Sequence, residues 1–495
     1  MSLPSLRADS PPHIVIVGGG IAGLAAAHRL VELSREQERP LRFTLLEAGR
    51  RLGGVIETER QEDFLLELGP DSFISEKPWA LALCRRLGLE SELIGTNDEN
   101  RATFVVHKGK LELLPQGFML LAPTQFGPLI RSRIFSWPGK LRIALDLVLP
   151  RAKEQEDESL GSFVRRRLGQ EALERIAQPL IGGIYTADPD QLSLAATMPR
   201  FLQMERDYRS VIYGLWRAAR RNPQTTQGTS GARWSLFVTL QGGMQRLVAA
   251  LTDQLSLGTI RHNCAVTTVQ YQSGEKGPQH APWQVECEDG STIQADGLVL
   301  ATPAFATERI VRDLDQALSR QLSSIAYSSA ATVNLAYRRD QVPHALNGFG
   351  FVVPSVENRS IIAGTFSSVK YAGRAPGDHA LFRVFVGGAL QAELFERDDS
   401  YIMHMVRGEL RQLLGIQAAP VFTRIARYPR SMPQYRVGHL HLVDEIEKQA
   451  AQYTRFALAG NAYRGVGLAD CVRSGEAAAE AVFSGCFLES LIGVR

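Results

Sequence analysis

Three glycines with a fixed spacing are the first residues in the chain that could do chemistry. Gly18, Gly20 and Gly23 form a GxGxxG motif directly after the β-branched segment His13–Val17. Such glycines make a tight turn, let the backbone approach a pyrophosphate, and let the following helix pack on the strand. The free N–H groups at the start of that helix can bind phosphate. We therefore predict dinucleotide binding by Gly18, Gly19, Gly20, Ile21, Ala22 and Gly23.

A second group of polar and small residues follows the next predicted strand, Leu41–Leu46. Glu47, at the end of that strand, is placed to accept hydrogen bonds from ribose hydroxyls. Arg51 can supply positive charge to a pyrophosphate, and Gly53–Gly54 let the backbone pass close to a flat ring. This ExxxRxGG spacing is much more restrictive than the glycine motif alone, so it strengthens the nucleotide prediction.

Signatures of other chemistries are missing from the sequence. The ten histidines include no HExxH motif, and no GxSxG motif occurs. The five cysteines form no CxxC pair, which predicts reduced thiols and no metal site. The sequence therefore does not support a metal-dependent or serine hydrolase. The cysteines are Cys84, Cys264, Cys287, Cys471 and Cys486.

The order of predicted elements indicates an α/β fold. A strand, a glycine-rich turn, a helix at Leu24–Glu32 and a second strand succeed one another, while residues 75–231 read as mostly helical. β patterns return from residue 233, and Phe456–Val482 reads as a strand, a glycine-rich loop and a helix. The later strands are expected at Ile260–Val269, Trp283–Cys287, Thr292–Ala301, Ala331–Tyr337 and Gly350–Val353.

This pattern predicts three units, two of them discontinuous. Residues 12–75, 233–300 and 455–485 form a Rossmann-like nucleotide-binding domain. Residues 76–110 and 305–450 form an α+β substrate domain, and residues 111–230 form a helical subdomain.

Composition excludes several classes of protein. The chain has 495 residues, 44% hydrophobic and 22% charged, with a net charge of +3. These values exclude a disordered, collagen-like or coiled-coil chain, and so small a charge is weak evidence for nucleic-acid binding. We expect no nucleic-acid partner. One apolar run, Leu113–Ile130, contains three prolines and two glycines, so it is not a simple membrane-spanning helix.

Longer motifs resemble a known family. The chain contains GPDSF, SLGSFVRRRLG, GGIYTADPDQLS, SMPQYRVGH and GNAYRGVGLADC, in that order. These resemble the oxygen-dependent protoporphyrinogen oxidases, together with the similar coproporphyrinogen III oxidases of Gram-positive bacteria, in the flavin amine oxidase superfamily. The resemblance runs from about His13 to Phe483. It implies an FAD-binding domain of the amine oxidase type.

The resemblance also implies site residues. The FAD contacts carry over to Glu47, Ala48, Arg51, Gly53, Gly54, Val55, Gly69, Pro70, Asp71, Ser72, Val266, Tyr428, Gly460, Val466, Gly467 and Leu468. Among these, Val266 would hold adenine through its backbone, and Tyr428 stands where relatives often have Trp beside the flavin.

The substrate contacts implied by the resemblance are fewer. Gly183 would face the tetrapyrrole near the flavin, and Tyr371 would stack on it. Thr103 stands where relatives acting on protoporphyrinogen often carry an Arg for a propionate, and Arg101 is the nearest cation. Arg101 reaching that carboxylate and a pocket of the coproporphyrinogen kind both remain open.

The reaction implied by the resemblance is a six-electron oxidation. Protoporphyrinogen IX becomes protoporphyrin IX through three rounds of hydride transfer to FAD, and dioxygen accepts the electrons and becomes hydrogen peroxide. No side chain need act as a general base. Coproporphyrinogen III is the alternative substrate. A flavin amine oxidase and a non-catalytic prenyl-protein carrier are the other classes that we consider.

Location and assembly are further expectations. We expect a cytoplasmic enzyme that contacts the cytoplasmic membrane peripherally, and we consider a homodimer. The contact would place Arg131, Arg133, Lys140 and Arg142 against lipid phosphates, with Phe135, Trp137, Leu141 and Leu145 in the interface. The alternative is that this segment is a buried helical hairpin covering the substrate pocket.

Overall fold

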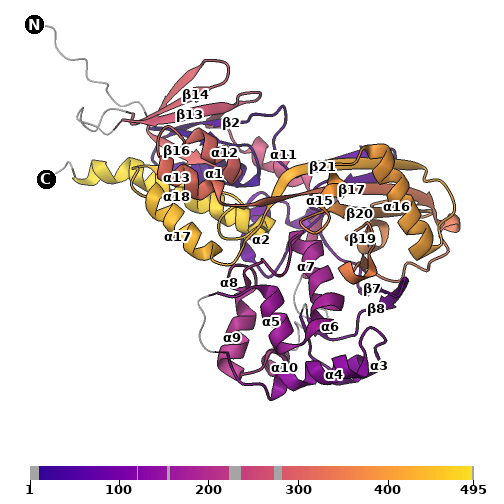
Figure 1. Cartoon of the computed structure of the whole chain (residues 1–495). Helices are drawn as coiled ribbons and strands as arrows, with labels where there is room; N and C mark the ends of the chain where they lie inside the picture. The colour runs from indigo at the N-terminus through magenta and orange to yellow at the C-terminus, as the bar shows by residue number, and fades with distance from the viewer. Residues whose placement is uncertain (1–10, 120, 153–156, 222–235, 273–280, 493–495) are drawn as a thin grey trace, which may run out of the picture.

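The structure is a computed structural model of the chain, and it describes residues 11–119, 121–152, 157–221, 236–272 and 281–492. Figure 1 shows three lobes: one around a parallel sheet, a second around a large mixed sheet, and a helical lobe below both. The chain passes between the lobes several times, so the first two are built from separate stretches of sequence, whereas the helical lobe is formed mainly by one stretch.

The first lobe contains a five-stranded parallel sheet. Ile14 and Ile16 pack beneath α1 and α18, whereas Val15 and Val17 pack against the core formed with α12, α13 and α17. Because both faces are buried, the strands are almost wholly apolar, and the predicted Rossmann-like sheet is confirmed. Its strands in spatial order are β12 (Gly258–Arg261), β2 (Arg42–Leu46), β1 (His13–Val17), β16 (Gly297–Leu300) and β22 (Phe456–Leu458). The helices are α1 (Ile21–Glu36), α12 (Ala304–Ile310), α13 (Gln316–Ser323), α17 (His439–Ala450) and α18 (Leu468–Ile492).

Two predicted strands are wrong in extent. The segment Ile260–Val269 is divided between β12 and β13, because Asn263 has a φ of +51° and turns the chain. The segment Thr292–Ala301 is divided between β15 and β16 at Asp296, whose carboxylate accepts a 2.7 Å hydrogen bond from the His13 N–H. In both cases the chain changes sheet. Strands β13 (Val266–Tyr271), β14 (Trp283–Cys287) and β15 (Thr292–Ala295) form an antiparallel sheet of their own.

Short strands connect the parallel sheet to the second lobe. A hairpin of β3 (Thr58–Gln61) and β4 (Phe64–Glu67) precedes the Gly69–Ser72 segment. A three-stranded sheet of β5 (Phe73–Ile74), β11 (Phe237–Leu240) and β6 (Leu93–Gly95) follows it.

The second lobe contains a seven-stranded sheet whose two faces differ. One face packs on α16 (Asp399–Leu414) through residues such as Val333 and Val384. Opposite-facing residues on the same strands include Thr332, Asn334 and Arg383, so the second face carries polar side chains beside apolar ones such as Phe385. The strands in spatial order are β21 (Phe422–Pro433), β17 (Tyr327–Arg338), β20 (His379–Gly387), β19 (Ala363–Phe366), β18 (Gly350–Val352), β7 (Thr103–His107) and β8 (Lys110–Leu113).

The prediction that residues 75–231 are mostly helical is wrong for residues 93–123. Here β6, β7, β8 and two short strands, Phe118–Met119 and Ala122–Pro123, are formed. The β-branched pair Val105–Val106 favours a strand. The helical lobe itself is formed mainly by α3 (Phe126–Arg131), α4 (Trp137–Ala144), α5 (Leu160–Arg167), α7 (Gln178–Tyr185), α9 (Pro199–Tyr208) and α10 (Val211–Arg221).

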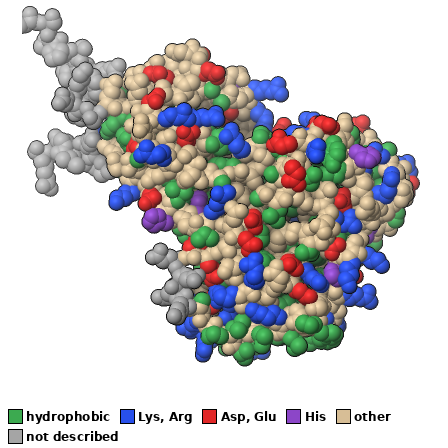
Figure 2. All heavy atoms as spheres, viewed as in Figure 1, with side chains coloured by type: hydrophobic (Ala, Val, Ile, Leu, Met, Phe, Trp, Pro, Cys, Tyr) green, Lys and Arg blue, Asp and Glu red, His purple; other side chains and the backbone are tan. Residues whose placement is uncertain are grey.

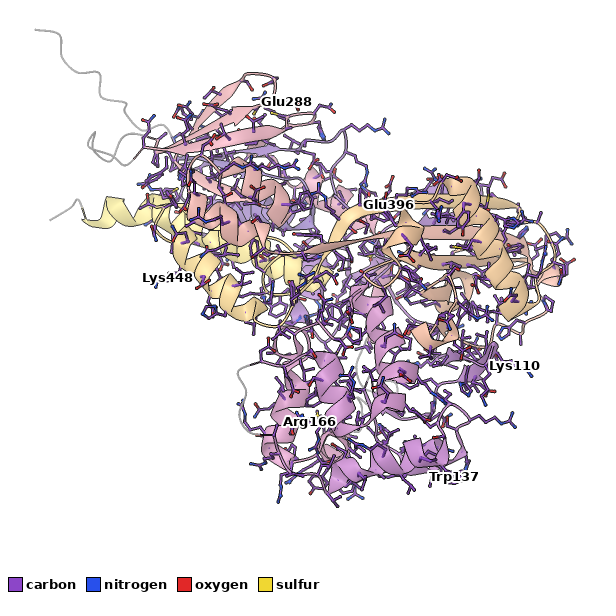
Figure 3. All side chains as sticks on the ribbon, in the orientation of Figure 1. Lys110, Trp137, Arg166, Glu288, Glu396 and Lys448 are labelled. Atoms are coloured by element: carbon purple, nitrogen blue, oxygen red, sulfur yellow. The ribbon has the colours of Figure 1, made fainter. Side chains whose placement is uncertain are left out.

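A buried ion network holds the helical lobe together. Arg167 and Asp146 are both fully buried, and the Arg167 Nε donates to an Asp146 carboxylate oxygen at 2.6 Å. Ser210 donates to the other oxygen at 2.6 Å. Arg166, labelled in Figure 3, donates to Glu205 at 2.6 Å. The network connects α5, α9 and the turn before α10.

Candidate functional site

The glycine-rich turn between β1 and α1 is shaped by its own packing. A Cβ on Gly23 would lie 1.9 Å from the Gly18 carbonyl oxygen, so alanine cannot fit there. Gly18 has a φ of +104°, which favours glycine. At Gly20 the situation differs, because a Cβ would meet no described atom within 4 Å. Gly20 therefore leaves space beside the helix start, which is the place expected for a phosphate.

Glu47 lies beside this turn. Its two carboxylate oxygens accept hydrogen bonds of 2.7 Å from the backbone N–H groups of Gly19 and Gly49. The Cys264 N–H donates to the Glu47 carbonyl at 2.9 Å. This contact places Cys264, two residues before Val266 at the start of β13, beside Glu47.

The segment Arg51–Val55 runs along the glycine-rich turn. The Gly53 N–H donates to the Gly19 carbonyl at 2.8 Å, and Gly54 has a φ of +59°. Val55 follows with its side chain exposed. The Arg51 guanidinium turns back into its own loop, where it donates to Ile56 and Gly54 carbonyls and pairs with Glu57 at 3.0 Å. Arg51 thus holds this loop in place, and its contact with a pyrophosphate stays a prediction.

Gly69, Pro70, Asp71 and Ser72 continue this line of residues. A Cβ on Gly69 would lie 1.7 Å from the Val55 carbonyl oxygen, so the two segments are in tight backbone contact. Ser72 donates to Asp71 at 2.8 Å, and Lys370 donates to the same carboxylate at 2.8 Å. Burial alone would raise the pKa of Asp71, but the charges of Lys370 and Arg383 hold it well below its usual range.

The polar face of the seven-stranded sheet forms a wall beside these loops. Arg383 donates to the Gly69 carbonyl and Thr332 donates to the Leu68 carbonyl at 2.8 Å, so the wall and the loops are in contact. Within the described ranges, three buried polar atoms of this wall have no hydrogen-bond partner. They are Arg383 Nε, Asn334 Nδ2 and the Tyr428 hydroxyl.

The C-terminal loop, Gly460–Gly467, also contains predicted cofactor residues. Gly460 has a φ of +125°, and the described part of the chain places no atom within 4 Å of a Cβ there. Tyr435 braces the loop, because its hydroxyl donates to the Asn461 carbonyl at 2.6 Å and accepts from the Gly465 N–H at 2.8 Å. Val466 and Gly467 then lead into α18, which begins at Leu468.

These segments fit an extended dinucleotide with a flat ring at one end. Gly20 leaves room for a phosphate, the Gly53–Val55 segment offers exposed backbone, and the wall offers unpaired donors that a ring with polar edges could use. Successive contacts join the glycine-rich turn to Glu47, to the Gly53–Val55 and Gly69–Ser72 segments and to Arg383, and Tyr428 lies on the same sheet face as Arg383.

The predicted substrate residues are more scattered. Gly183 and Ile184 are exposed at the end of α7. Thr103 lies in β7 opposite Gly350, and Arg101 pairs with Asp98 on the preceding loop. Tyr371 is only 2% exposed. The cations Lys370 and Arg374 lie 5.0 and 5.6 Å from its ring centre. Its role as a stacking platform stays a prediction.

Sequence reasoning missed several residues of the wall. Arg383 and Phe385 of the wall were not singled out, and neither were the adjacent Lys370 and Arg374 or the buried carboxyl of Glu67. A signal existed for Arg383, since it is the one charged residue in the otherwise apolar run Ala380–Val386. The structure adds that Arg383 lies 4.8 Å from the centre of the Phe385 ring.

Glu67 should make stability depend on pH. Burial raises its pKa to about 7 from 4.5, although hydrogen bonds from the Met244 N–H and Thr58 oppose the shift. Because the folded pKa exceeds the unfolded one, the folded protein binds more protons and stability falls as pH rises from 4.5 to 7. The loss is at most about 1.4 kcal/mol per pH unit. In the Glu67→Gln variant, the free energy of unfolding measured by urea denaturation should not fall over this pH range. The same dependence on pH as in the parent would contradict the assignment.

Comparisons with known proteins identify the family. The family model for flavin containing amine oxidoreductases matches residues 21–483. Coproporphyrinogen III oxidase of Bacillus subtilis strain 168 is 34% identical, over 95% of this chain and 97% of that protein. Protoporphyrinogen oxidase of Bos taurus is 32% identical, over 95% and 98%.

Solved structures show the same fold. A crystal structure provisionally described as a protoporphyrinogen oxidase from Exiguobacterium sp. 255-15 has a TM-score of 0.82 and 31% identity, and covers 96% of this chain and 99% of that chain. Putrescine oxidase bound to putrescine has a TM-score of 0.65 at 16% identity, which shows the fold alone. The chain belongs to the flavin-containing amine oxidoreductase family and, within it, to the group that contains the coproporphyrinogen III and protoporphyrinogen oxidases.

Proposed function

We propose that the protein is an FAD-dependent porphyrinogen oxidase of haem biosynthesis. It would oxidise protoporphyrinogen IX to protoporphyrin IX, with dioxygen as the acceptor and hydrogen peroxide as the product. One observation carries the proposal. Val466 of the C-terminal loop and Phe385 of the wall both pack against the apolar core of the helical lobe. The predicted cofactor residues therefore adjoin an apolar region, which suits the uncharged ring of a porphyrinogen.

FAD, when bound, would supply the chemistry by accepting a hydride from the macrocycle. Gly18–Gly23 and Glu47 would bind its adenosine diphosphate half, and the Gly69–Ser72 segment would orient the ring. Phe385 is only partly buried and offers an aromatic ring for a tetrapyrrole, beside the buried Val352 and Ala363 on neighbouring strands of the same sheet face. Tyr371 is almost wholly enclosed, so Phe385 is the better candidate for stacking.

Coproporphyrinogen III is the second candidate substrate. It carries four propionates where protoporphyrinogen carries two. Three relatives named coproporphyrinogen III oxidase are 31–35% identical to this chain, and Thr103 replaces the Arg that the protoporphyrinogen enzymes often carry. Each porphyrinogen should be supplied separately in air, with porphyrin fluorescence and oxygen uptake recorded. The true substrate should consume three molecules of dioxygen for each porphyrin formed. If neither porphyrinogen yields a porphyrin, the proposal is wrong.

Peripheral membrane contact is part of the proposal. The side chains of Trp137, Leu141 and Val148 are 65%, 67% and 74% exposed, and Leu145 is exposed beside them. Figure 2 shows hydrophobic side chains gathered along the lower edge of the helical lobe, with Lys and Arg among them, and Figure 3 places Trp137 at this edge. Among the described residues, no helix is long and apolar enough to cross a membrane.

Two details of the predicted membrane face are wrong. Phe135 is buried and stacks on Phe118 at 5.9 Å, so it does not reach the surface. Arg142 donates to carbonyls at the end of α5, including that of Arg166 at 2.7 Å, so its guanidinium caps this helix rather than facing outward. Arg131 and Arg133 are exposed. Lys140 lies 4.6 Å from the Trp137 ring centre.

Replacing Trp137 and Leu141 together by Glu should weaken binding to vesicles by at least about a hundredfold, because each apolar side chain contributes about 1.5–3 kcal/mol when buried. Co-sedimentation with vesicles containing anionic lipid would measure this. Val421→Glu, an exposed apolar position on another lobe, is the matched control. Equal sedimentation of the double variant and the parent would contradict membrane contact by this face.

A further inference from the structure

Three charged side chains form a cluster where the wall meets the predicted flavin segment. The Lys370 Nζ lies 2.8 Å from an Asp71 carboxylate oxygen, and the Arg383 Nη1 lies 3.8 Å from the same oxygen. Arg383 also donates to the carbonyls of Gly69 and Leu68. One carboxylate therefore faces two cations.

Arg383 is the less satisfied of the two cations. It is only 5% exposed, and its Nε has no hydrogen-bond partner within the described residues. A buried guanidinium is costly unless its donors and its charge are matched. The Asp71 carboxylate is closer to Lys370 than to Arg383, so it neutralises Lys370 more fully than Arg383.

No other described carboxylate corrects the imbalance. Arg374, also buried nearby, donates to Thr239 and to carbonyls rather than to an acid. Glu67 has a pKa raised by burial to about 7, so it is largely uncharged below that pH. The cluster therefore carries an excess positive charge, and such a site stabilises an anion.

We propose that Arg383 is a positioning residue that fixes the Gly69–Ser72 segment and supplies the positive charge against which the flavin is reduced. This inference rests on the flavin-dependent function proposed above. A flavin gains negative charge on reduction, and a preorganised cation in a buried site favours that charge strongly. Asp71 opposes the effect, so the balance between Arg383 and Asp71 sets how readily the flavin is reduced.

A flavin fits this cluster better than a substrate propionate does. Arg383 binds the carbonyls of Leu68 and Gly69, which adjoin the residues implied for the flavin. Tyr428, implied to stand beside the flavin, lies on the same sheet face and within electrostatic range of Arg383. Of the substrate residues implied by the sequence, Tyr371 lies beside the cluster, with Lys370 5.0 Å from its ring centre, but it is almost wholly enclosed. Arg101 pairs instead with Asp98.

The test is the midpoint potential of the bound flavin, measured by reduction against a reference dye in the absence of porphyrinogen. In the Arg383→Met variant, reduction should become about tenfold to a hundredfold less favourable, which is about 30–60 mV lower for a two-electron couple. Arg383→Lys should recover most of the shift. Arg424→Met is the matched control, because Arg424 is a cation in β21 that pairs with the exposed Glu59 at 2.7 Å.

Asp71→Asn gives a second, opposite expectation. Removing the carboxylate should make reduction about tenfold more favourable, and this variant decides the question if Arg383→Met does not retain flavin. A potential equal to that of the parent in Arg383→Met, or a fall in Asp71→Asn, would overturn the inference. An unchanged potential with a raised KM in Arg383→Met would assign the cation to a substrate carboxylate instead. Because the titration contains no porphyrinogen, its outcome is separate from the test of the proposed substrate.

Discussion

The Gly20→Ala variant should fold like the parent and bind FAD about a hundredfold more weakly. A Cβ at Gly20 meets no described protein atom within 4 Å, so the folded protein can accept it. The methyl group would instead occupy the space beside the start of α1, where the phosphate is expected. Overpacking of this kind costs about 1–3 kcal/mol, and about 2.8 kcal/mol is a hundredfold in affinity.

Reconstitution of the apoprotein with FAD, followed by fluorescence, would measure the affinity. The stability of the apoprotein should change by about 1 kcal/mol or less, the usual cost of alanine at a helix cap. Gly408→Ala, an equally open position in the interior of α16, should leave the FAD affinity unchanged and raise the stability by about 0.5–1 kcal/mol. Gly23→Ala should lose both stability and flavin, because its Cβ would lie 1.9 Å from a backbone oxygen. Parent-like affinity in Gly20→Ala would place the phosphate elsewhere.

The Arg167→Met variant should lower the free energy of unfolding by about 3–5 kcal/mol. Arg167 and Asp146 are fully buried, and removal of one partner leaves the other charge buried and unpaired. Ser210 would still donate to Asp146, but it cannot neutralise the carboxylate. Urea denaturation followed by circular dichroism would measure the change.

Two further variants control this experiment. Arg165→Met removes a half-exposed cation of the same helix, paired with Asp190, and should cost about 1 kcal/mol or less. Replacing Arg167 by Met and Asp146 by Leu together should recover much of the loss, because no unpaired charge remains. A loss below about 1 kcal/mol in Arg167→Met would mean that water reaches Asp146.

Local signals in the sequence predict the nucleotide unit well. The β1–turn–α1–β2 order depends on contacts between near neighbours, and strict glycine positions mark it, so it could be recognised from residues 13–47. Strand limits were harder to predict. Asn263 and Asp296 end strands through a left-handed turn and a hydrogen bond to His13, and neither feature can be seen in an apolar pattern.

The wall of the site could not be predicted in the same way. Arg383 and Lys370 meet Asp71 only because β20 and the short helix Ser367–Lys370 before it bring distant segments together. The register of the sheet decides which side chains face the flavin segment. The membrane face shows the same limit. Phe135 and Trp137 are two residues apart and equally apolar, yet one is buried and the other is exposed.

The central claim is that flavin held by this chain oxidises a porphyrinogen directly. The most direct test mixes the flavin-loaded protein anaerobically with protoporphyrinogen IX and, separately, with coproporphyrinogen III, and follows flavin absorbance and porphyrin fluorescence together. Three flavins should be bleached for each porphyrin formed with the true substrate, and admission of air should restore the flavin and produce hydrogen peroxide. Flavin that stays oxidised with both porphyrinogens would contradict the account.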